Sequence, residues 1–283
     1  MEPQPVRGNK VVVVTGATGG IGRALTEALY ARGVHTVIAA CRTPKRLEDI
    51  GETLAARYPD NGSEIIGLQL DLGSYGAVDS AVDALRSLGL RIDGLINNAG
   101  TMPLRTLSVS PDGHEYTMQV NCLSTLRFTL GVLPLMRRGG NVVFTTSVTR
   151  RLPKPTDKFD EANLNARTLV SRFLNYGRSK QVLTFTAALL AEREAVSGIR
   201  FNCADPGVVD SGIITLGYPV VDKLADRLFR PLISTPAQGA EAALRALDTD
   251  RQSTVSTRHA TRSLSIDAYK RAIGTHALSL AGC

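Results

Sequence analysis

Short apolar segments alternate along this chain with longer stretches in which apolar residues recur every three or four positions. Continuous apolar runs are typical of strands buried on both faces, and the wider spacing is typical of amphipathic helices. The predicted strands cover residues 11–14, 36–41, 65–70, 94–96, 141–146 and 200–204, and the predicted helices cover residues 21–32, 44–58, 74–88, about 112–136 and 175–197. This alternation predicts an α/β fold in which right-handed βαβ units build a single doubly wound parallel sheet of about seven strands, flanked by helices.

Two long connections interrupt this rhythm. Residues 150–175 form a polar, proline-containing insert between Ser147 and Tyr176. Residues 208–236 are rich in apolar side chains, and in a doubly wound sheet the segment after the sixth strand lies over the edge where ligands bind. We therefore predict that residues 208–236 form a substrate lid, with ordinary packing of a surface loop as the alternative.

The end of the chain does not follow the repeating pattern. Residues 252–283 begin with polar Ser and Thr residues and become loosely helical at 264–273. This extension would cap the substrate cleft, contact another subunit or be partly disordered. Because no internal repeat or low-complexity linker divides the chain, we expect residues 1–283 to form a single domain.

Composition and charge exclude several classes of protein. With 43% hydrophobic and 21% charged residues, the chain has the composition of an ordinary globular domain, and no apolar run reaches the ~18 residues that a membrane helix needs. The N-terminus lacks the basic and apolar regions of a signal peptide, so a cytoplasmic location is expected. Although the net charge is +7, the Lys and Arg residues are dispersed without interleaved aromatics, which argues against nucleic-acid binding. The four Cys and four His residues are equally scattered, so no metal site is expected.

A glycine-rich turn follows the first predicted strand directly. Gly16 can adopt the backbone angles of a tight turn, Gly20 lets a phosphate approach the main chain, and Gly22 lets the next helix pack closely on the strand. That helix would direct its free N–H groups and the positive end of its dipole at a pyrophosphate. The turn therefore predicts a dinucleotide site, whose residues we expect to be Gly16, Thr18, Gly19, Gly20, Ile21 and Gly22.

A second chemical signal lies in the predicted helix 175–197. Tyr176 and Lys180 are four residues apart, so their side chains share one helix face. A free phenol, with a pKa of roughly 10, is a poor base near neutral pH, but a neighbouring ammonium favours the phenolate and lowers that pKa. The pair would thus donate and accept a proton at a carbonyl or alcohol oxygen.

Further landmarks stand at the ends of other predicted strands, in the order Asp71-Leu72, Asn97-Asn98-Ala99-Gly100, Ser147 and Pro206-Gly207. Together with the glycine turn and the Tyr-x-x-x-Lys pair, they resemble the short-chain dehydrogenase/reductase family over roughly residues 8–250. The resemblance is strongest to its retinol-dehydrogenase-like and ketoreductase branch. It implies a Rossmann-type fold and an oxidoreductase that binds a nicotinamide dinucleotide.

The resemblance also implies roles for individual residues. Tyr176 would be the general acid/base, Ser147 would hydrogen-bond the substrate oxygen, and Lys180 would bind the nicotinamide ribose while tuning Tyr176. Asn121 would hold a water that links Lys180 to solvent, the alternative being a polar core residue in a kinked helix. Thr146 is the competing candidate for the role of Ser147.

The remaining implied residues bind the cofactor. Asp71 would contact adenine, with a plain helix cap as the alternative, and the backbone at Val209 would meet the carboxamide. Ser211 stands where the family usually has Thr, and because serine also carries a hydroxyl group, that group is kept. Besides the glycine turn, the cofactor site would comprise Arg42, Asp71, Leu72, Asn98, Ala99, Gly100, Tyr176, Lys180, Pro206, Gly207, Val209 and Ser211.

The end of the second predicted strand indicates which cofactor is used. NAD-preferring relatives carry an acidic residue there, which accepts hydrogen bonds from the ribose hydroxyls. This chain has Ala40-Cys41-Arg42 instead. The neutral Cys41 does not repel a 2′-phosphate as an acidic side chain would, and Arg42 offers that phosphate a guanidinium. NADP(H) is therefore the expected cofactor.

These observations together predict an NADP(H)-dependent carbonyl reductase, reversible as an alcohol dehydrogenase, that acts on a lipophilic ketone or aldehyde. A non-catalytic NADP(H)-binding sensor or scaffold is the alternative, although such proteins typically lose the Tyr or the Ser. An epimerase or dehydratase would need a larger C-terminal substrate domain. The expected partners are a small-molecule substrate and further copies of the chain in a homodimer or homotetramer, with no nucleic acid and no integral membrane segment.

Overall fold

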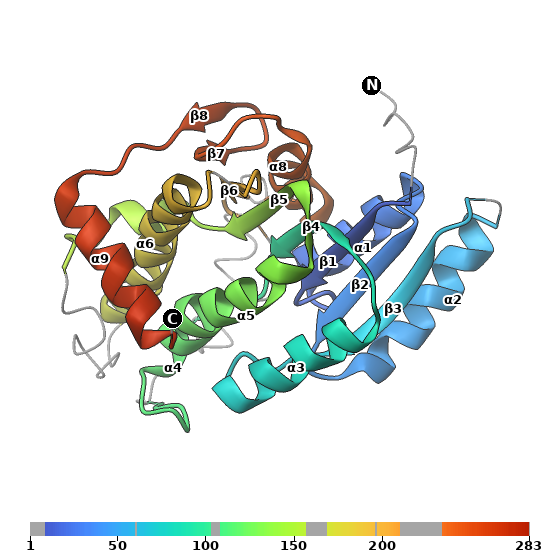
Figure 1. Cartoon of the computed structure of the whole chain (residues 1–283), viewed down its shortest axis with the longest axis horizontal. Helices are drawn as coiled ribbons and strands as arrows, with labels where there is room; N and C mark the ends of the chain where they lie inside the picture. The colour runs from blue at the N-terminus through green and yellow to red at the C-terminus, as the bar shows by residue number, and fades with distance from the viewer. Residues whose placement is uncertain are drawn as a thin grey trace.

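The computed structural model describes residues 9–59, 61–102, 108–156, 169–195, 197–209 and 234–282. Within these ranges eight strands form one sheet in the order β3-β2-β1-β4-β5-β6-β7-β8, and every neighbouring pair is parallel except β7 with β8. The strands are β1 Val11–Thr15, β2 Thr36–Cys41, β3 Glu64–Gln69, β4 Ile92–Asn97, β5 Met136–Thr145, β6 Arg200–Ala204, β7 Thr254–Ser256 and β8 Thr261–Ser263. The order reverses between β1 and β4, so the doubly wound α/β fold predicted from the sequence is confirmed (Figure 1).

Helices cover both faces of this sheet (Figure 1). They are α1 Gly20–Ala31, α2 Glu48–Arg57, α3 Tyr75–Ser87, α4 Tyr116–Met118, α5 Ser124–Val132, α6 Leu169–Arg193, α8 Pro236–Asp248 and α9 Ala268–Leu280. Successive residues of β1 point to opposite faces, which explains why its valine run is buried throughout. Val11 and Val13 belong to one apolar core with α3, α5, α6 and α9, whereas Val12 and Val14 belong to a second core with α1, α2 and α8.

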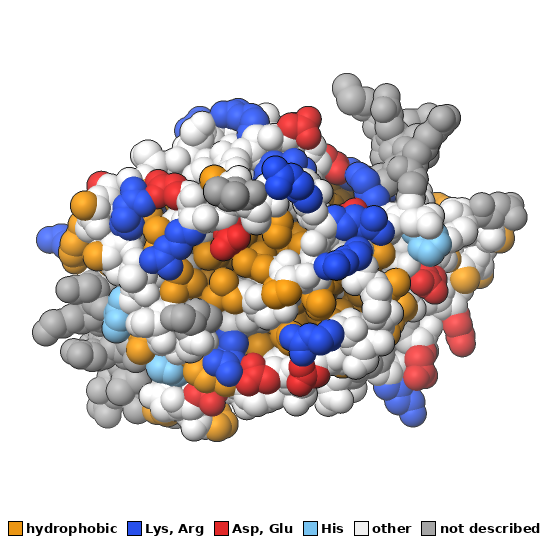
Figure 2. All heavy atoms as spheres, viewed as in Figure 1, with side chains coloured by type: hydrophobic (Ala, Val, Ile, Leu, Met, Phe, Trp, Pro, Cys, Tyr) orange, Lys and Arg blue, Asp and Glu red, His pale blue; other side chains and the backbone are white. Residues whose placement is uncertain are grey.

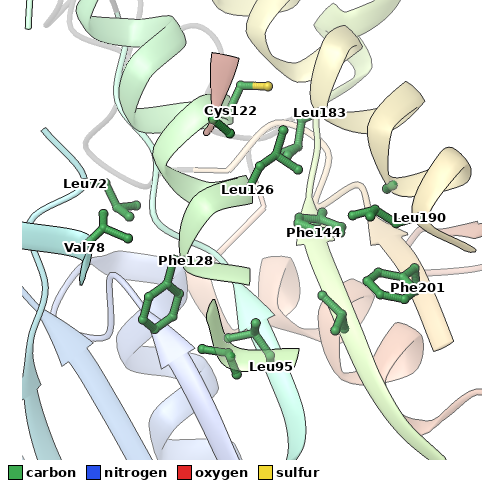
Figure 3. Close-up of a cluster of buried hydrophobic side chains, with 14 of the residues drawn as sticks. Leu72, Val78, Leu95, Cys122, Leu126, Phe128, Phe144, Leu183, Leu190 and Phe201 are labelled. Carbon is green, nitrogen blue, oxygen red and sulfur yellow. The ribbon is translucent and has the colours of Figure 1, made fainter. Parts of the chain in front are cut away.

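The larger core lies on the face of the sheet that α3, α5, α6 and α9 cover. Phe128 of α5, Phe144 of β5 and Phe201 of β6 are fully buried in it (Figure 3). Burying one such side chain contributes about 1.5–3 kcal/mol relative to leaving it exposed. Cys122 belongs to the same core, so this packing reaches the helical turn that carries the neighbouring Asn121.

The helix predicted at 112–136 is interrupted in the structure. It consists of α4, a π-helical turn at Gln119–Leu123, α5 and a 3₁₀ turn at Leu133–Leu135 that contains a proline. Proline cannot continue an α-helix, so the chain leaves helical structure here. β5 then begins at Met136, earlier than the predicted residue 141, because its first part is polar and exposed and gives no apolar signal.

The helix that carries Tyr176 begins at Leu169, so part of the insert predicted at 150–175 is helical. The prediction was wrong at this boundary because the first turns of α6, which mix apolar and polar residues, were counted with the polar, proline-containing stretch before them. Arg172 and Asn175, two polar residues of these turns, are buried. Residues 157–168 of the insert lie outside the described residues.

The chain end also differs from its prediction. Helix α9 starts at Ala268 rather than near residue 264, because Leu264 and Ile266 lie ahead of it and pack against the larger core from non-helical positions. Its first turn is capped by Asp267, whose side chain accepts a hydrogen bond from the Lys270 amide at 2.9 Å. The preceding β7 and β8 extend the sheet with an antiparallel edge that the sequence did not predict.

Helix α9 packs along α6 (Figure 1). Beyond its last turn, the Leu280 carbonyl accepts a hydrogen bond from the Tyr75 hydroxyl at 2.8 Å, and the Ala281 carbonyl accepts one from Arg127 at 3.1 Å. These contacts tie the described part of 252–283 to α3 and α5. None of its described residues lines the cavity at the strand ends, so this part does not cap the cleft.

Candidate active site

A cavity of about 650 Å³ opens at the carboxyl ends of β1 to β6. This is the edge of a doubly wound sheet at which ligands bind. The structure gathers most of the predicted site residues along its wall: Gly16, Thr18, Gly19, Gly20, Ile21, Gly22, Arg42, Asp71, Leu72, Asn98, Ala99, Gly100, Ser147, Tyr176, Lys180, Pro206, Gly207 and Val209. Asn121 is fully buried and does not line the cavity, and Ser211 lies outside the described residues.

The glycine turn is held against the loop that follows β4. Gly16 has a φ of +66°, and a Cβ atom there would lie 2.9 Å from the Cα of Ala99. A Cβ atom on Gly22 would collide with the Gly16 carbonyl oxygen, so the close contact of this glycine is with the turn itself rather than with the strand. Asn98 supports the same packing by donating a hydrogen bond to the Thr15 carbonyl at 3.0 Å.

The start of α1 is left open toward the cavity. Its N-cap residue, Gly19, has no side chain to satisfy the first N–H groups, and no acidic residue lies in the first turn. Gly20, Ile21 and Gly22 line the cavity. An uncapped helix start with its positive dipole end is suited to a pyrophosphate, so these residues fit a dinucleotide cofactor.

Arg42 and Asp71 line the cavity where β2 and β3 end. Arg42 is exposed and follows the buried Cys41, and no acidic residue stands at this strand end. Asp71 accepts a hydrogen bond from the Gly73 amide at 2.8 Å and lines the cavity. It does not cap α3, whose N-cap is Ser74, so the alternative interpretation of Asp71 as a helix cap is wrong.

Tyr176, Ser147 and Lys180 meet at the wall between β5 and α6. The Ser147 hydroxyl lies next to Tyr176, and Lys180 Nζ lies 5.9 Å from the centre of the Tyr176 ring. Burial raises the pKa of Tyr176 to about 12, although the neighbouring Ser147 hydroxyl acts in the opposite direction. The sequence predicted a lowered pKa from the lysine, but loss of solvent around the phenol raises the pKa instead. The phenol is therefore protonated at neutral pH.

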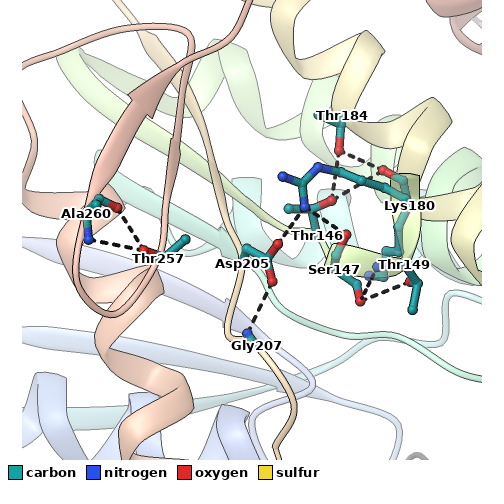
Figure 4. A network of polar contacts seen from close by, with 10 residues as sticks. Thr146, Ser147, Thr149, Lys180, Thr184, Asp205, Gly207, Thr257 and Ala260 are labelled. Atoms are coloured by element: carbon teal, nitrogen blue, oxygen red, sulfur yellow. Dashed lines mark hydrogen bonds and ion pairs between the residues drawn. The ribbon is translucent and has the colours of Figure 1, made fainter. Parts of the chain in front are cut away.

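Ser147, rather than Thr146, presents its hydroxyl to the cavity. The Thr146 hydroxyl is engaged by α6, where it shares a hydrogen bond of 2.8 Å with Thr184 (Figure 4). The Ser147 hydroxyl accepts a hydrogen bond from the Thr149 hydroxyl at 2.9 Å and also contacts Tyr176. Of the two candidates, the geometry favours Ser147 as the residue that meets a substrate oxygen.

Asn121 lies in the π-helical turn and joins two parts of the site. Its amide group accepts a hydrogen bond from the Thr101 N–H at 2.7 Å and donates to the Thr101 carbonyl at 2.8 Å and to Ser179 at 3.1 Å. Asn121 therefore connects the loop after β4 to α6, as a polar core residue in a kinked helix would. The water-holding role stays a prediction.

One charged pair near the site was missed by the sequence analysis. Arg150 Nη1 contacts Asp205 Oδ2 at 2.5 Å, and the two side chains are only 11% and 9% exposed. Arg150 follows Ser147 closely, and Asp205 stands directly before Pro206. Their positions next to predicted site residues could have drawn attention to each of them. No local sequence pattern, however, indicates that two residues so far apart in the chain form an ion pair.

Surface charge on the face shown in Figure 2 is distributed rather than concentrated. On the face shown in Figure 2, Lys and Arg side chains lie at separate points around an apolar centre, among Asp and Glu side chains. Some of the basic residues form ion pairs, such as Arg127 with Asp79 at 2.7 Å. Within the described ranges, no three metal-ligating side chains gather at one point, and no helix has the length and apolar character needed to cross a membrane.

Comparison with known proteins places the chain in a family. The model of the short chain dehydrogenase family matches residues 10–157. Polyprenol dehydrogenase of Mus musculus is 33% identical over 219 residues, which are 75% of this chain and 62% of that protein. Short-chain dehydrogenase/reductase sthC of Phaeosphaeria nodorum is 30% identical over 251 residues, 84% of this chain and 78% of that protein.

A solved structure agrees with these matches. A short-chain dehydrogenase from Streptomyces avermitilis shares the fold with a TM-score of 0.63 and 27% identity, over 89% of this chain and 88% of that one. The chain therefore belongs to the short-chain dehydrogenase/reductase family, as the motif order predicted. Members of this family are dehydrogenases, and the chain spans 62% of the length of the mouse relative that it matches.

Proposed function

We propose that this protein reduces a ketone or aldehyde with NADPH and oxidises the corresponding alcohol with NADP⁺. The observation that carries the proposal is that two chemistries meet in one cavity. The glycine turn and the uncapped start of α1 suit a pyrophosphate. In the same cavity the neighbouring Ser147 and Tyr176 offer two hydroxyl groups to a carbonyl oxygen.

Support for NADPH over NADH comes from the end of β2. Arg42 is exposed and lines the cavity, and Lys45 is exposed nearby in the chain. A guanidinium binds phosphate through two parallel hydrogen bonds, whereas an acidic side chain at this position would repel a 2′-phosphate. We therefore assign to Arg42 the contact with the 2′-phosphate.

The proposed chemistry divides between the cofactor and the protein. When bound, the reduced nicotinamide supplies the hydride that becomes bonded to the carbonyl carbon. Tyr176 donates its hydroxyl proton to the carbonyl oxygen, so that the product is a neutral alcohol, and in the reverse direction its phenolate accepts that proton. Ser147 donates a hydrogen bond to the same oxygen as negative charge develops on it.

Lys180 has two tasks in this proposal. Burial lowers its pKa to about 8, so the ammonium form still prevails at neutral pH. Its positive charge favours the Tyr176 phenolate that remains after proton transfer, which makes the step easier in both directions. Its three N–H donors also suit the hydroxyls of a nicotinamide ribose.

Apolar residues at the cavity wall support a lipophilic substrate. Met102, Val148, Phe173 and Val208 line it, and Val148 and Val208 leave 47% and 51% of their surface exposed. Exposed apolar surface at a cavity mouth favours an apolar ligand, at roughly 25 cal/mol per Å² removed from water. The name of the mouse relative, polyprenol dehydrogenase, points in the same direction.

The two described ends of the predicted lid, 208–236, come together beside the cavity. The Ser234 amide donates a hydrogen bond to the Val208 carbonyl at 2.9 Å, and α8 begins at Pro236 behind a capping box formed by Thr235 and Gln238. Residues 210–233, the rest of the predicted lid, lie outside the described residues. The position of the two described ends beside the cavity supports the proposal of a lid.

The proposal is tested by following NADPH consumption with methyl ketones from butan-2-one to dodecan-2-one, with aldehydes of matching length, and with NADH in parallel. We expect turnover with NADPH that improves with chain length, and oxidation of the corresponding alcohols with NADP⁺. NADPH binding without turnover on any member of the panel would instead favour a sensor or scaffold. A preference for NADH would contradict the role of Arg42.

A further inference from the structure

The strands that carry the two reaction partners separate at the cavity. The pairing of β5 with β6 ends at Thr145 and Ala204, followed by one more hydrogen bond from the Thr146 amide to the Ala204 carbonyl at 2.8 Å. Beyond it, one chain turns into the loop that carries Ser147, and the other enters the Pro206–Gly207 turn. Under the proposed function, the first loop holds the substrate oxygen and the second holds the nicotinamide. Their separation therefore controls hydride transfer.

A single guanidinium nitrogen joins the two loops after the ladder ends. Arg150 Nη1 donates to the Ser147 carbonyl at 2.8 Å and to Asp205 Oδ2 at 2.5 Å. The other oxygen of Asp205 accepts the Gly207 amide at 3.2 Å (Figure 4). A continuous chain of hydrogen bonds thus runs from the backbone of the serine to the backbone of the nicotinamide-side turn.

Both partners of the pair are also fixed from behind. The Arg150 carbonyl accepts a hydrogen bond of 2.9 Å from Gln181, the residue that follows Lys180 on α6. The Asp205 amide donates to the Ser256 carbonyl of β7 at 2.8 Å. The pair consequently connects the serine loop, the cofactor turn and the helix that carries Tyr176.

Stability alone does not explain this pair. Removing two charges from water costs free energy that their attraction offsets only in part, so a buried ion pair is often no more stabilising than apolar side chains of similar size. Neither Arg150 nor Asp205 lines the cavity, so they act through the residues they hold. What the pair adds is fixed geometry between two loops that no longer share a strand ladder.

We infer that Arg150 and Asp205 are positioning residues that set the separation between the Ser147 loop and the Pro206–Gly207 turn, and hence between the substrate carbonyl and the nicotinamide. The inference rests on the proposed oxidoreductase function. It assigns a role to two residues that stand outside the Ser, Tyr, Lys and Asn positions of the family resemblance.

The pair also influences the charge around Tyr176. The groups that act on this phenol are Ser147 after β5 and Asp205 after β6, and Arg150 reaches it only through its ion pair with Asp205. Lys180 lies beside the ring, with Cys122 and Cys203 near its ammonium group. The Asp205 carboxylate raises the pKa of Tyr176, and the Arg150 guanidinium partly neutralises that carboxylate. Loss of Arg150 alone therefore leaves a stronger negative field at the phenol.

The test compares wild-type protein with Arg150→Met, Arg150→Lys, Asp205→Asn and the double variant Arg150→Met/Asp205→Asn. Arg258→Met, which removes a guanidinium from an exposed ion pair with Glu241, is the matched control. Each full-length protein is assayed with NADPH and the best ketone of the panel above, and with NADP⁺ and the corresponding alcohol across pH. Thermal unfolding confirms that each variant is folded.

We expect Arg150→Met to lower kcat about ten- to a hundredfold while the KM for NADPH changes less than threefold, because geometry and not phosphate binding is lost. Its pH profile for alcohol oxidation should shift to higher pH, and the double variant should return that profile toward wild type while kcat stays low. Arg150→Lys should recover part of the rate, and Arg258→Met should behave as wild type.

Two results would overturn the inference while leaving the proposed function intact. One is an active wild type with a folded Arg150→Met variant whose kcat lies within twofold of it. The other is a pH profile that is the same in all variants, with rate losses that match the loss of folded protein. An inactive wild type would instead contradict the proposed function itself.

Discussion

Lys180 Nζ donates a hydrogen bond to the Thr145 carbonyl oxygen at 2.8 Å, and this ties α6 to the last residue of β5. The lysine is only 2% exposed. Burial disfavours its ammonium form and lowers its pKa to about 8. The cavity wall therefore holds an ammonium group whose charged form is disfavoured by its own burial.

This burial has a consequence for stability. The pKa of Lys180 is about 8 in the folded protein and roughly 10.4 in an unfolded chain, so between these values the unfolded state binds more protons. The Lys180 contribution to the free energy of unfolding should thus rise with pH through this window, by about 1–3 kcal/mol. The check is urea denaturation of wild type and Lys180→Met from pH 7.5 to 10. The difference between the two proteins isolates the lysine from the Cys and Tyr residues, whose raised pKa values act in the opposite direction.

Gly100 leaves room for the same lysine. A Cβ atom there would lie 3.4 Å from Lys180 Nζ and 3.3 Å from Asn121 Oδ1, so Gly100→Ala must displace one of these groups slightly. We expect kcat to fall several-fold with little change in thermal stability. Gly51→Ala is the control, because nothing lies within 4 Å of its added Cβ and alanine suits a helix interior better than glycine. Equal activity in both variants would show that the lysine tolerates displacement.

Arg42→Ala should raise the KM for NADPH by about ten- to a hundredfold and leave the KM for NADH nearly unchanged. A charge-assisted contact contributes on the order of 1.5–3 kcal/mol, and only NADPH carries the 2′-phosphate. Adding Cys41→Asp should move the preference further toward NADH. Steady-state kinetics with both cofactors provide the measurement, with Arg86→Ala on α3 as a control. A proportional change for both cofactors would contradict a phosphate contact.

The lid proposal is tested with Leu224→Ala and Phe229→Ala, which fall within the segment 210–233 outside the described residues. If their apolar side chains bind substrate, catalysis on dodecan-2-one should weaken while butan-2-one, which is too short to reach them, is little affected. Size-exclusion chromatography of each variant separates a damaged lid from a damaged assembly. Equal losses on the long and short ketones would indicate a role in folding or assembly.

The sequence was most informative where function depends on short local motifs. The valine run of β1, the glycine turn and the Tyr176–Lys180 spacing each lie within one element and its connection. The structure buries the valine run in the two cores and brings the glycine turn, Tyr176 and Lys180 to one cavity. The meeting of site residues that follow different strands could also be predicted, because parallel strands place their carboxyl ends on the same edge of the sheet.

What the sequence could not predict depends on distant contacts. The pairing of Arg150 with Asp205 has no local pattern, and the direction of the Tyr176 pKa shift depends on how much solvent the folded chain excludes. The antiparallel β8 was missed because Thr261–Ser263 is a short, polar edge strand without an apolar signal. The start of α6 was missed because its first turns, which mix apolar and polar residues, follow the proline-containing stretch directly and were counted with it.

The most direct test of the proposed mechanism is the rate of carbonyl reduction by Tyr176→Phe, measured beside its affinity for NADPH. The phenol supplies the proton to the substrate oxygen but makes no contact with the cofactor phosphates, so we expect kcat to fall about 10²–10⁴-fold while the Kd for NADPH changes little. Near-normal turnover in a folded Tyr176→Phe protein would contradict proton transfer by Tyr176.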